Sequence, residues 1–93
     1  QSLSLLNSSF VIERARALAA RLARDSGPGR DARIARAFLL ALGRPPSRAE
    51  HDAAAQFLDA QPPRYAGRAD AVERSWADLC QMILASNAFL YIE

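Results

Sequence analysis

The segment ARIARAFLLALGRPPSRAE, residues 32–50, decides the fold that the sequence predicts. Its first half repeats apolar residues at the spacing of one helix face, and Gly43 follows as a residue that accepts the left-handed exit from a helix. Pro45 and the proline after it then make a rigid turn. Ser47 and Glu50 have the spacing of a capping box, in which each side chain accepts a hydrogen bond from the backbone N–H of the other. The segment therefore predicts two helices joined by a tight turn.

Outward from this segment, the same periodicity predicts about four helices, and no strand pattern competes with it. Glycine and proline separate the helices at residues 27–29 and in a loop over residues 61–67. Short connections favour antiparallel neighbours, so we expect an all-α domain, built as a compact bundle or an orthogonal array. The expected helices cover residues 9–25, 31–42, 47–60 and 69–87, with Ser8 or Ser9, Asp31 and Ser47 as N-caps and Asn87 as a stop.

Each expected helix has an apolar face that can supply a core. The helix over residues 31–42 is apolar on most sides, which is typical of a central helix. We therefore expect it in the middle of the packing. The residues expected in the core are Val11, Ala15, Leu18, Leu22, Ile34, Ala37, Phe38, Ala41, Ala54, Phe57, Leu58, Val72, Trp76, Leu79, Cys80 and Ile83.

The composition is that of one ordinary globular domain. The chain has 93 residues, of which 51 % are hydrophobic and 24 % charged, so we expect a single domain over residues 1–93, with residues 1–7 as the tail of a preceding element. Twelve arginines and ten acidic residues give a net charge of +2, and their alternation along the chain disfavours a nucleic-acid-binding face. No apolar run approaches the ~20 residues that span a bilayer. The start at Gln1, without a signal peptide, indicates a fragment of a longer protein.

Few residues could carry chemistry. One histidine, His51, and one cysteine, Cys80, are too few for a structural zinc site or a disulfide. Asp52 and Asp59 lie on one expected helix but too far apart along it to work as an acid–base pair. The Cys-x-x-Cys-His run that attaches c-type haem is absent. We therefore expect no enzyme, no catalytic residue, no cofactor and no metal.

The best candidate for a surface binding site is the cluster of Arg64, Tyr65 and Arg68 in and beside the expected loop. Loops carry recognition more often than cores do, although such a cluster is also compatible with a solvated loop. Arg44 has a structural interpretation instead. After a glycine C-cap, its guanidinium can satisfy the last carbonyls of the preceding helix or pair with Glu50.

Three classes of function remain open. The first is a structural or protein-interaction domain that docks on other domains of its parent protein or on a protein partner; its oligomeric state stays open. The second is nucleic-acid binding, since residues 31–60 resemble a helix-turn-helix, although the acidic start of its second helix disfavours base and phosphate contacts. The third is an accessory domain that lends residues to an enzyme site in the parent. An apolar surplus favours the first class: Leu3, Leu5, Leu6, Leu40, Met82 and residues 89–92.

Three motifs in this order resemble a known family: LLNSSF at residues 5–10, LGRPP at 42–46 and NAFLY at 87–91. They are similar to the C-terminal helical domain, of unknown function, of large planctomycete proteins that also carry cytochrome c-like segments. Ser9 stands where proline is common in that family, and serine suits the same helix start. The resemblance implies the C-terminal end of a large exported or cell-envelope protein, and it implies no chemistry.

Overall fold

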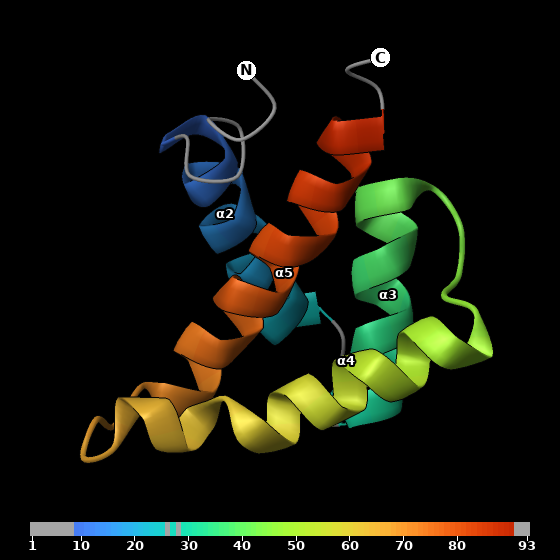
Figure 1. Cartoon of the computed structure of the whole chain (residues 1–93). Coiled ribbons are helices and arrows are strands. Elements are labelled where there is room, and N and C mark those ends of the chain that lie inside the picture. The colour runs from blue at the N-terminus through green and yellow to red at the C-terminus, as the bar shows by residue number, and fades with distance from the viewer. Residues whose placement is uncertain (1–8, 26, 28, 91–93) are drawn as a thin grey trace.

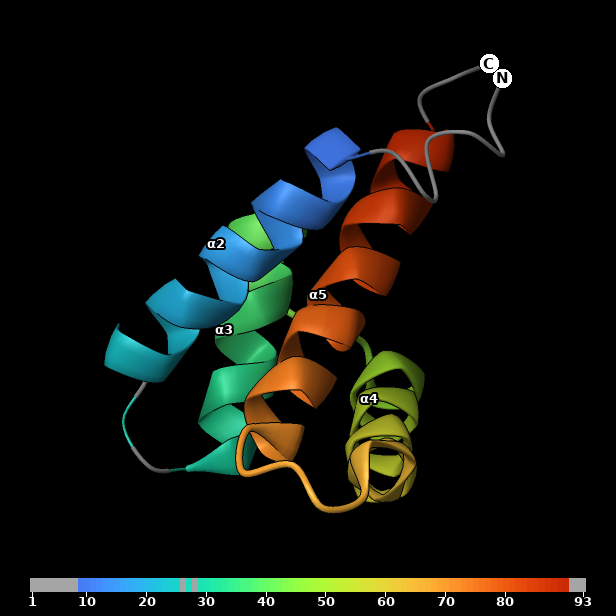
Figure 2. The same cartoon turned by 90° about the vertical axis from the view of Figure 1, so that its left-hand side faces the viewer.

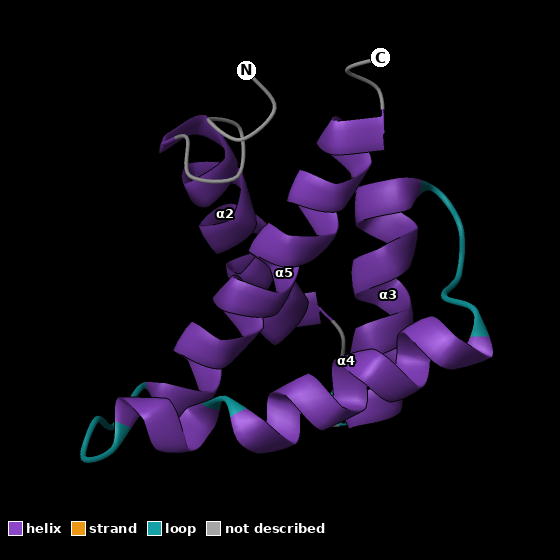
Figure 3. Cartoon of the chain, viewed as in Figure 1, coloured by secondary structure: helices purple, strands orange, loops and turns teal. Residues whose placement is uncertain are grey.

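The structure, a computed structural model, describes residues 9–25, 27 and 29–90, the last four by their backbone alone. Every element in that part of the chain is helical (Figure 3), which confirms the predicted all-α fold. The first three α-helices begin and end within one residue of their predicted bounds. The elements are α2 (Ser9–Asp25), α3 (Arg30–Leu42), α4 (Arg48–Ala60), the 3-10 helix η1 (Pro62–Tyr65) and α5 (Ala71–Leu90).

The central element is α5, which contacts α2, α3, α4 and η1. α2 and α5 lie side by side and run in opposite directions, while α4 crosses below α3 and α5 (Figures 1 and 2). The prediction that residues 31–42 form the central helix is wrong. Leu39 is 48 % exposed, and Leu40 and Leu42 are only partly buried. Leucine is a strong helix former, so a helix at the side of the core tolerates apolar residues on its outer face.

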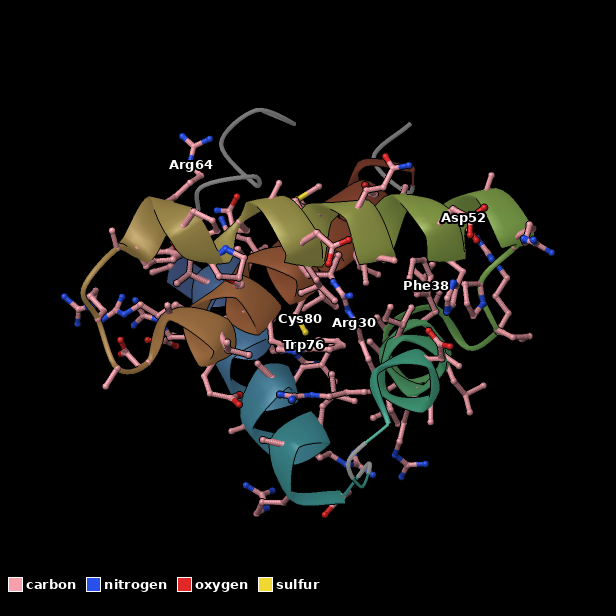
Figure 4. The ribbon with its side chains drawn as sticks, turned by 90° about the horizontal axis from the view of Figure 1, so that it is seen from below. Arg30, Phe38, Asp52, Arg64, Trp76 and Cys80 are labelled. Atoms are coloured by element: carbon pink, nitrogen blue, oxygen red, sulfur yellow. The ribbon has the colours of Figure 1, made fainter. Side chains whose placement is uncertain are left out.

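The core is built mainly on α5 and confirms most of the predicted positions. Trp76 and Cys80 lie in the middle of the molecule (Figure 4), and Cys80 is fully buried. Val72 was expected there but is 55 % exposed, because it lies in the first turn of α5, outside the main packing. Leu18, Ala41 and Phe57 are partly buried at the edge of the core. The cluster consists of Ala15, Ala19, Leu22, Ile34, Ala37, Phe38, Ala54, Leu58, Trp76, Leu79, Cys80 and Ile83, and Val11 is buried as well.

The helix ends follow the predicted signals in part. Gly43 adopts φ 77° and its N–H donates to the Leu39 carbonyl at 2.8 Å, as a C-cap glycine does. Gly29, not Asp31, is the N-cap of α3. Asp31 lies one residue inside the helix, where its negative charge favours the helix N-terminus and its side chain reaches toward α4.

The region after α4 differs most from the prediction. Residues 62–65 form a 3-10 helix instead of part of a loop, and α5 begins at Ala71, two residues later than expected. Asn87 does not stop α5, which continues to Leu90, because the residues that follow Asn87 are compatible with a helix. Some predictions lie outside the described residues. They concern the Ser8 cap, the tail over residues 1–7 with its leucines, the side chains of Phe89 and Leu90, and residues 91–92.

Candidate interaction surface

Arg44 completes the turn between α3 and α4. Its guanidinium donates to both Glu50 oxygens, at 2.8 and 2.9 Å. Glu50 also accepts from the Ser47 N–H at 2.8 Å, while the Ser47 hydroxyl accepts from the Glu50 N–H at 3.1 Å. The contact with Arg44, followed by that with Ser47, lowers the pKa of Glu50 to about 2. The predicted capping box and the predicted Arg44–Glu50 pair are both confirmed, and this carboxylate is engaged by the turn itself.

The three members of the predicted binding cluster differ in their exposure and in their partners. Arg64 points outward from η1 into solvent (Figure 4). Arg68 pairs with Asp70 at 3.1 Å, which lowers the pKa of that carboxyl. Tyr65 is half-buried, and its hydroxyl donates to Asp78 on α5. The cluster thus combines one half-buried aromatic residue, which lines a groove, with two exposed arginines.

Asp78 ties the connection after α4 to the central helix. Its Oδ2 accepts from the Tyr65 hydroxyl and from the Gln61 amide at 3.0 Å. The hydrogen bond to Asp78 raises the pKa of Tyr65, because ionised tyrosine could not donate it. Arg74, one turn earlier on α5, lies 5.9 Å from the Tyr65 ring centroid and pairs with Asp70 at 3.0 Å. The sequence analysis did not select Asp78, since no local pattern links residues that lie 13 and 17 positions apart.

Tyr65 and Asp78 line a groove of about 630 Å³ between α2 and α5. On the α2 side it extends from Ile12 to Arg24, and on the α5 side from Glu73 to Gln81. Short side chains keep it open along α2, where the backbone of a partner could approach closely. The small residues that line it are Ala15, Ala19, Ala20 and Ala23 of α2 and Ala77 of α5.

The charged groups of this α2–α5 groove are satisfied unequally. Glu73 pairs with Arg33 at 2.9 Å, and Asp78 holds the two hydrogen bonds from Tyr65 and Gln61. The arginines of α2 that line the groove, Arg16 and Arg24, lie on its other side. Neither makes an ion pair or a side-chain hydrogen bond within the described residues.

A second groove, of about 210 Å³, lies between α3, α4 and α5. Its lining is apolar except for Glu50 and Ser86. Met82 lines this groove, and 51 % of its surface is exposed. This Met82 groove contains one of the residues expected as apolar surplus. Leu40, another of them, is half-buried beside α2.

Comparison with known proteins identifies the first part of the chain. The family model PSD1, described as a protein of unknown function (DUF1553), matches residues 1–58. The chain belongs to this family. The PSD1 match includes α2, α3 and most of α4, and it ends before η1 and α5. Two of the three motifs behind the resemblance, at residues 5–10 and 42–46, lie within it.

No curated protein and no solved structure matches the chain. The α2–α5 groove is shared between the part that PSD1 covers and the part beyond it, because α2 lies inside the matched residues and α5 outside them. The PSD1 match therefore covers only the α2 wall of the groove and does not include its α5 wall.

The side chains of this PSD1 member that could carry chemistry, Cys80 and His51, are either buried or next to carboxylates. Cys80 is fully buried, which confirms its predicted place in the core, and this burial raises the pKa of its thiol to about 12. The His51 Nε2 lies 3.2 Å from Asp31 and its Nδ1 3.9 Å from Asp52. Over residues 9–25, 27 and 29–90, no three His, Cys, Asp or Glu side chains gather as metal ligands would. Within the same residues, no helix combines the length and the apolar character that crossing a membrane requires.

Proposed function

We propose that this chain is a non-catalytic protein-interaction domain, and that its α2–α5 groove holds another segment of the parent protein. The observation that carries the proposal is the shape of the groove. It extends along α2 from Ile12 to Arg24, which is about 18 Å at the rise of an α-helix. That length matches about three turns of a docked helix. Recognition of a helix in a groove between two others is a common mode of protein association.

The small residues on the groove floor support this occupant. Ala19 of α2 and Ala77 of α5 line the groove, and their short side chains leave space between the two helices. A docked helix would contact this floor through its own apolar face, and burial of about 25 cal/mol per Å² of apolar surface would favour the complex. Tyr65 would add an aromatic contact, because its ring lines the groove while its hydroxyl is held by Asp78.

The non-catalytic part of the proposal is supported by how the polar side chains are used. Glu50 and Asp78 each hold two structural hydrogen-bond partners, and the Cys80 thiol stays protonated because of its raised pKa. A catalytic site requires such groups to converge on a space where a substrate can react. Nucleic-acid binding and a contribution to an enzyme site in the parent stay predictions, and no contact described above favours either.

The parent protein belongs to the same proposal. The motif resemblance supports a large exported protein of planctomycete type with cytochrome c-like segments, in which this domain forms the C-terminal end. The PSD1 match supports the family part of that resemblance. In this arrangement the domain packs on the remainder of its own chain, which would cover the α2–α5 groove.

The test is the accessibility of the groove to a thiol reagent. In an Ala20→Cys variant, a maleimide should label the groove rapidly in the isolated domain, since Ala20 is exposed there. Cys80 is fully buried with a pKa raised to about 12, so it does not compete. In the full-length parent protein carrying the same substitution, labelling should be at least about tenfold slower, as expected for a site covered most of the time.

Ala60→Cys provides the matched control, because Ala60 is exposed at the end of α4 and lines neither groove. Its labelling rate should be the same in the isolated domain and in the parent. Equal rates for Ala20→Cys in both contexts would show that the parent leaves the groove open, and the proposal would then be wrong.

A further inference from the structure

We infer that the segment bound in the α2–α5 groove is acidic, and that two of its carboxylates pair with Arg16 and Arg24. This inference rests on the proposed function and specifies the chemistry of the partner. It is carried by a difference within the groove. The acidic residues of the α5 wall already have donors, whereas the two arginines of the α2 wall have no acceptor within the described residues.

The carboxylates of the α5 wall are engaged inside the domain. Glu73 accepts from Arg33, whose guanidinium also lies 4.2 Å from the Trp76 ring centroid. Asp78 accepts from the Tyr65 hydroxyl and the Gln61 amide. A basic partner would have to compete with these contacts, so the α5 wall offers it little.

The arginines of the α2 wall behave differently. Several other exposed arginines pair with carboxylates, as Arg21 does with Asp25 and Arg30 with Asp59. Among the described residues Arg14 and Arg64 have no such pair, but neither of them lines the α2–α5 groove. Arg16 and Arg24 line the groove, and neither forms an ion pair with a carboxylate among the described residues. If a neutral apolar segment covered them, each guanidinium would lose water without gaining an acceptor, which is unfavourable. A segment that supplies carboxylates avoids this loss, because arginine binds a carboxylate through two parallel hydrogen bonds.

The spacing of the two arginines restricts the partner further. Their positions along α2 differ by eight residues, which is about 12 Å at 1.5 Å per residue. A docked helix presents side chains at about this distance on one face when they are about seven residues apart. We therefore expect two Asp or Glu residues at such a spacing, with small or apolar residues between them to contact the alanine floor.

A nucleic acid is the less favoured acidic partner. Its phosphates repeat about every 1.7 Å along the duplex axis, and binding rests on many Lys and Arg contacts. The groove presents two arginines without an acceptor among the described residues, and Glu73 and Asp78 line its other wall. Those carboxylates would repel a continuous phosphate backbone, whereas a protein segment can place two acidic groups and leave the rest neutral.

A selection from a displayed pool of random peptides, about 16 residues long so that a helix could span the groove, tests the inference. The intact domain serves as bait at low salt. The enriched peptides should carry paired acidic residues above their frequency in the starting pool, and raised salt should weaken their binding. An Arg16→Glu/Arg24→Glu variant should no longer enrich acidic peptides. The milder Arg16→Gln/Arg24→Gln variant should weaken the same peptides at least about tenfold, as for the loss of charged hydrogen bonds.

The matched control is Arg48→Glu/Arg64→Glu, which makes the same change in net charge at two exposed sites outside the groove lining. It should enrich the same acidic peptides as the unaltered domain. Circular dichroism of each variant separates a loss of binding from a loss of folding. A labelled DNA duplex forms a further arm of the experiment. We expect no binding that depends on Arg16 and Arg24 at about 0.15 M salt.

Three results would overturn the inference. They are enrichment of apolar peptides without acidic residues, enrichment of acidic peptides that the control abolishes equally, and binding of DNA through the same two arginines. None of these decides the proposed function, which depends on whether the parent covers Ala20. Conversely, a groove left open in the parent would contradict the proposed function even if acidic peptides bind the isolated domain.

Discussion

The two connections that flank α4 are stabilised in opposite ways. The connection before α4 closes on itself, since Arg44 and Ser47 both bind Glu50, no more than six residues away. The connection after α4 closes on a distant helix, since Gln61 and Tyr65 bind Asp78, which is 17 and 13 residues further along the chain. One is a local turn, and the other exists only once α5 has packed.

This difference separates structural from functional roles. The residues of the local turn are mostly exposed and line neither wall of the α2–α5 groove. The long-range connection places the Tyr65 ring in that groove and holds it there by a half-buried hydrogen bond. The shape of the proposed binding surface therefore depends on Asp78, whereas the start of α4 depends on Ser47 and Glu50.

The largest effect is expected from Asp78→Ala. Removing the carboxylate leaves the Tyr65 hydroxyl and the Gln61 amide without their shared acceptor, and both groups are partly buried. The free energy of unfolding should fall by about 2–3 kcal/mol, as for lost hydrogen bonds to a charged group. Urea unfolding followed by circular dichroism measures this. A change below about 0.5 kcal/mol, typical of a surface substitution, would show that Asp78 does not hold this connection.

Asp78→Asn is the matched control, because it keeps an oxygen acceptor and the size of the side chain while removing the charge. It should cost less than Asp78→Ala, and the pKa of Tyr65 should return toward its ordinary value. Tyr65 donates its hydrogen bond to Asp78 only while it is neutral, which is why its pKa is raised. This hydrogen bond contributes fully to stability below the ordinary tyrosine pKa of about 10, and the contribution is lost as the pH rises through the raised pKa. Absorbance titration in a Tyr91→Phe background follows Tyr65 as the only tyrosine.

A smaller effect is expected at the local turn. Ser47→Ala removes the hydroxyl that accepts from the Glu50 N–H at 3.1 Å, and the loss of such a cap costs about 1 kcal/mol. Ser47→Asp should retain most of the stability, since aspartate also accepts from the first turn of a helix. Thermal unfolding of the three proteins at one pH compares them. Equal stability of Ser47→Ala and the unaltered domain would mean that the capping box contributes nothing.

The same contrast explains how far the fold was predictable from the sequence. The turn over residues 43–47 and the bounds of the first three helices depend on neighbours within one or two turns, and periodicity and capping residues record such contacts. The centre of the bundle was misplaced, because the leucines of residues 31–42 were taken to indicate burial on most sides. The longer α5 is the more apolar helix, its apolar residues are spread more evenly around it, and it contacts more of the other elements.

The candidate site was predictable only in fragments. Tyr65 was selected as an aromatic residue between arginines. Its hydrogen bond to Asp78 joins residues 13 positions apart, and helical periodicity does not indicate such a contact. Arg16 and Arg24 look like any solvated arginines of a helix, since whether a carboxylate among the described residues pairs with them depends on how the helices pack. The α2–α5 groove appears only when both helices are placed, so composition and spacing cannot indicate it.

Acid titration measures how much the charge of Glu50 contributes to the connection before α4. The pKa of Glu50 is lowered from 4.5 to about 2, so its contribution to stability is complete above pH 4.5 and is lost as pH falls toward 2. The Glu50 side chain is 35 % exposed, so screening by solvent should reduce this contribution to about 1 kcal/mol or less. Glu50→Gln keeps the capping geometry without the charge and should flatten this acid dependence. An unchanged dependence between about pH 5 and pH 2.5 would assign it to other carboxylates such as Asp70.

The smallest effect is expected at Arg64, which points into solvent beside Tyr65 (Figure 4). Arg64→Ala should change the free energy of unfolding by less than about 0.5 kcal/mol, because the side chain has no described partner to lose. Tyr65→Phe, one residue further, removes the hydroxyl bound to Asp78 and should cost about 1–2 kcal/mol. Urea unfolding of both variants tests whether these two members of the predicted cluster contribute differently to stability, because Tyr65 binds α5 and the Arg64 side chain has no described partner. A larger loss for Arg64→Ala than for Tyr65→Phe would place the stabilising contact on the outer face of η1 and reverse the interpretation of this connection.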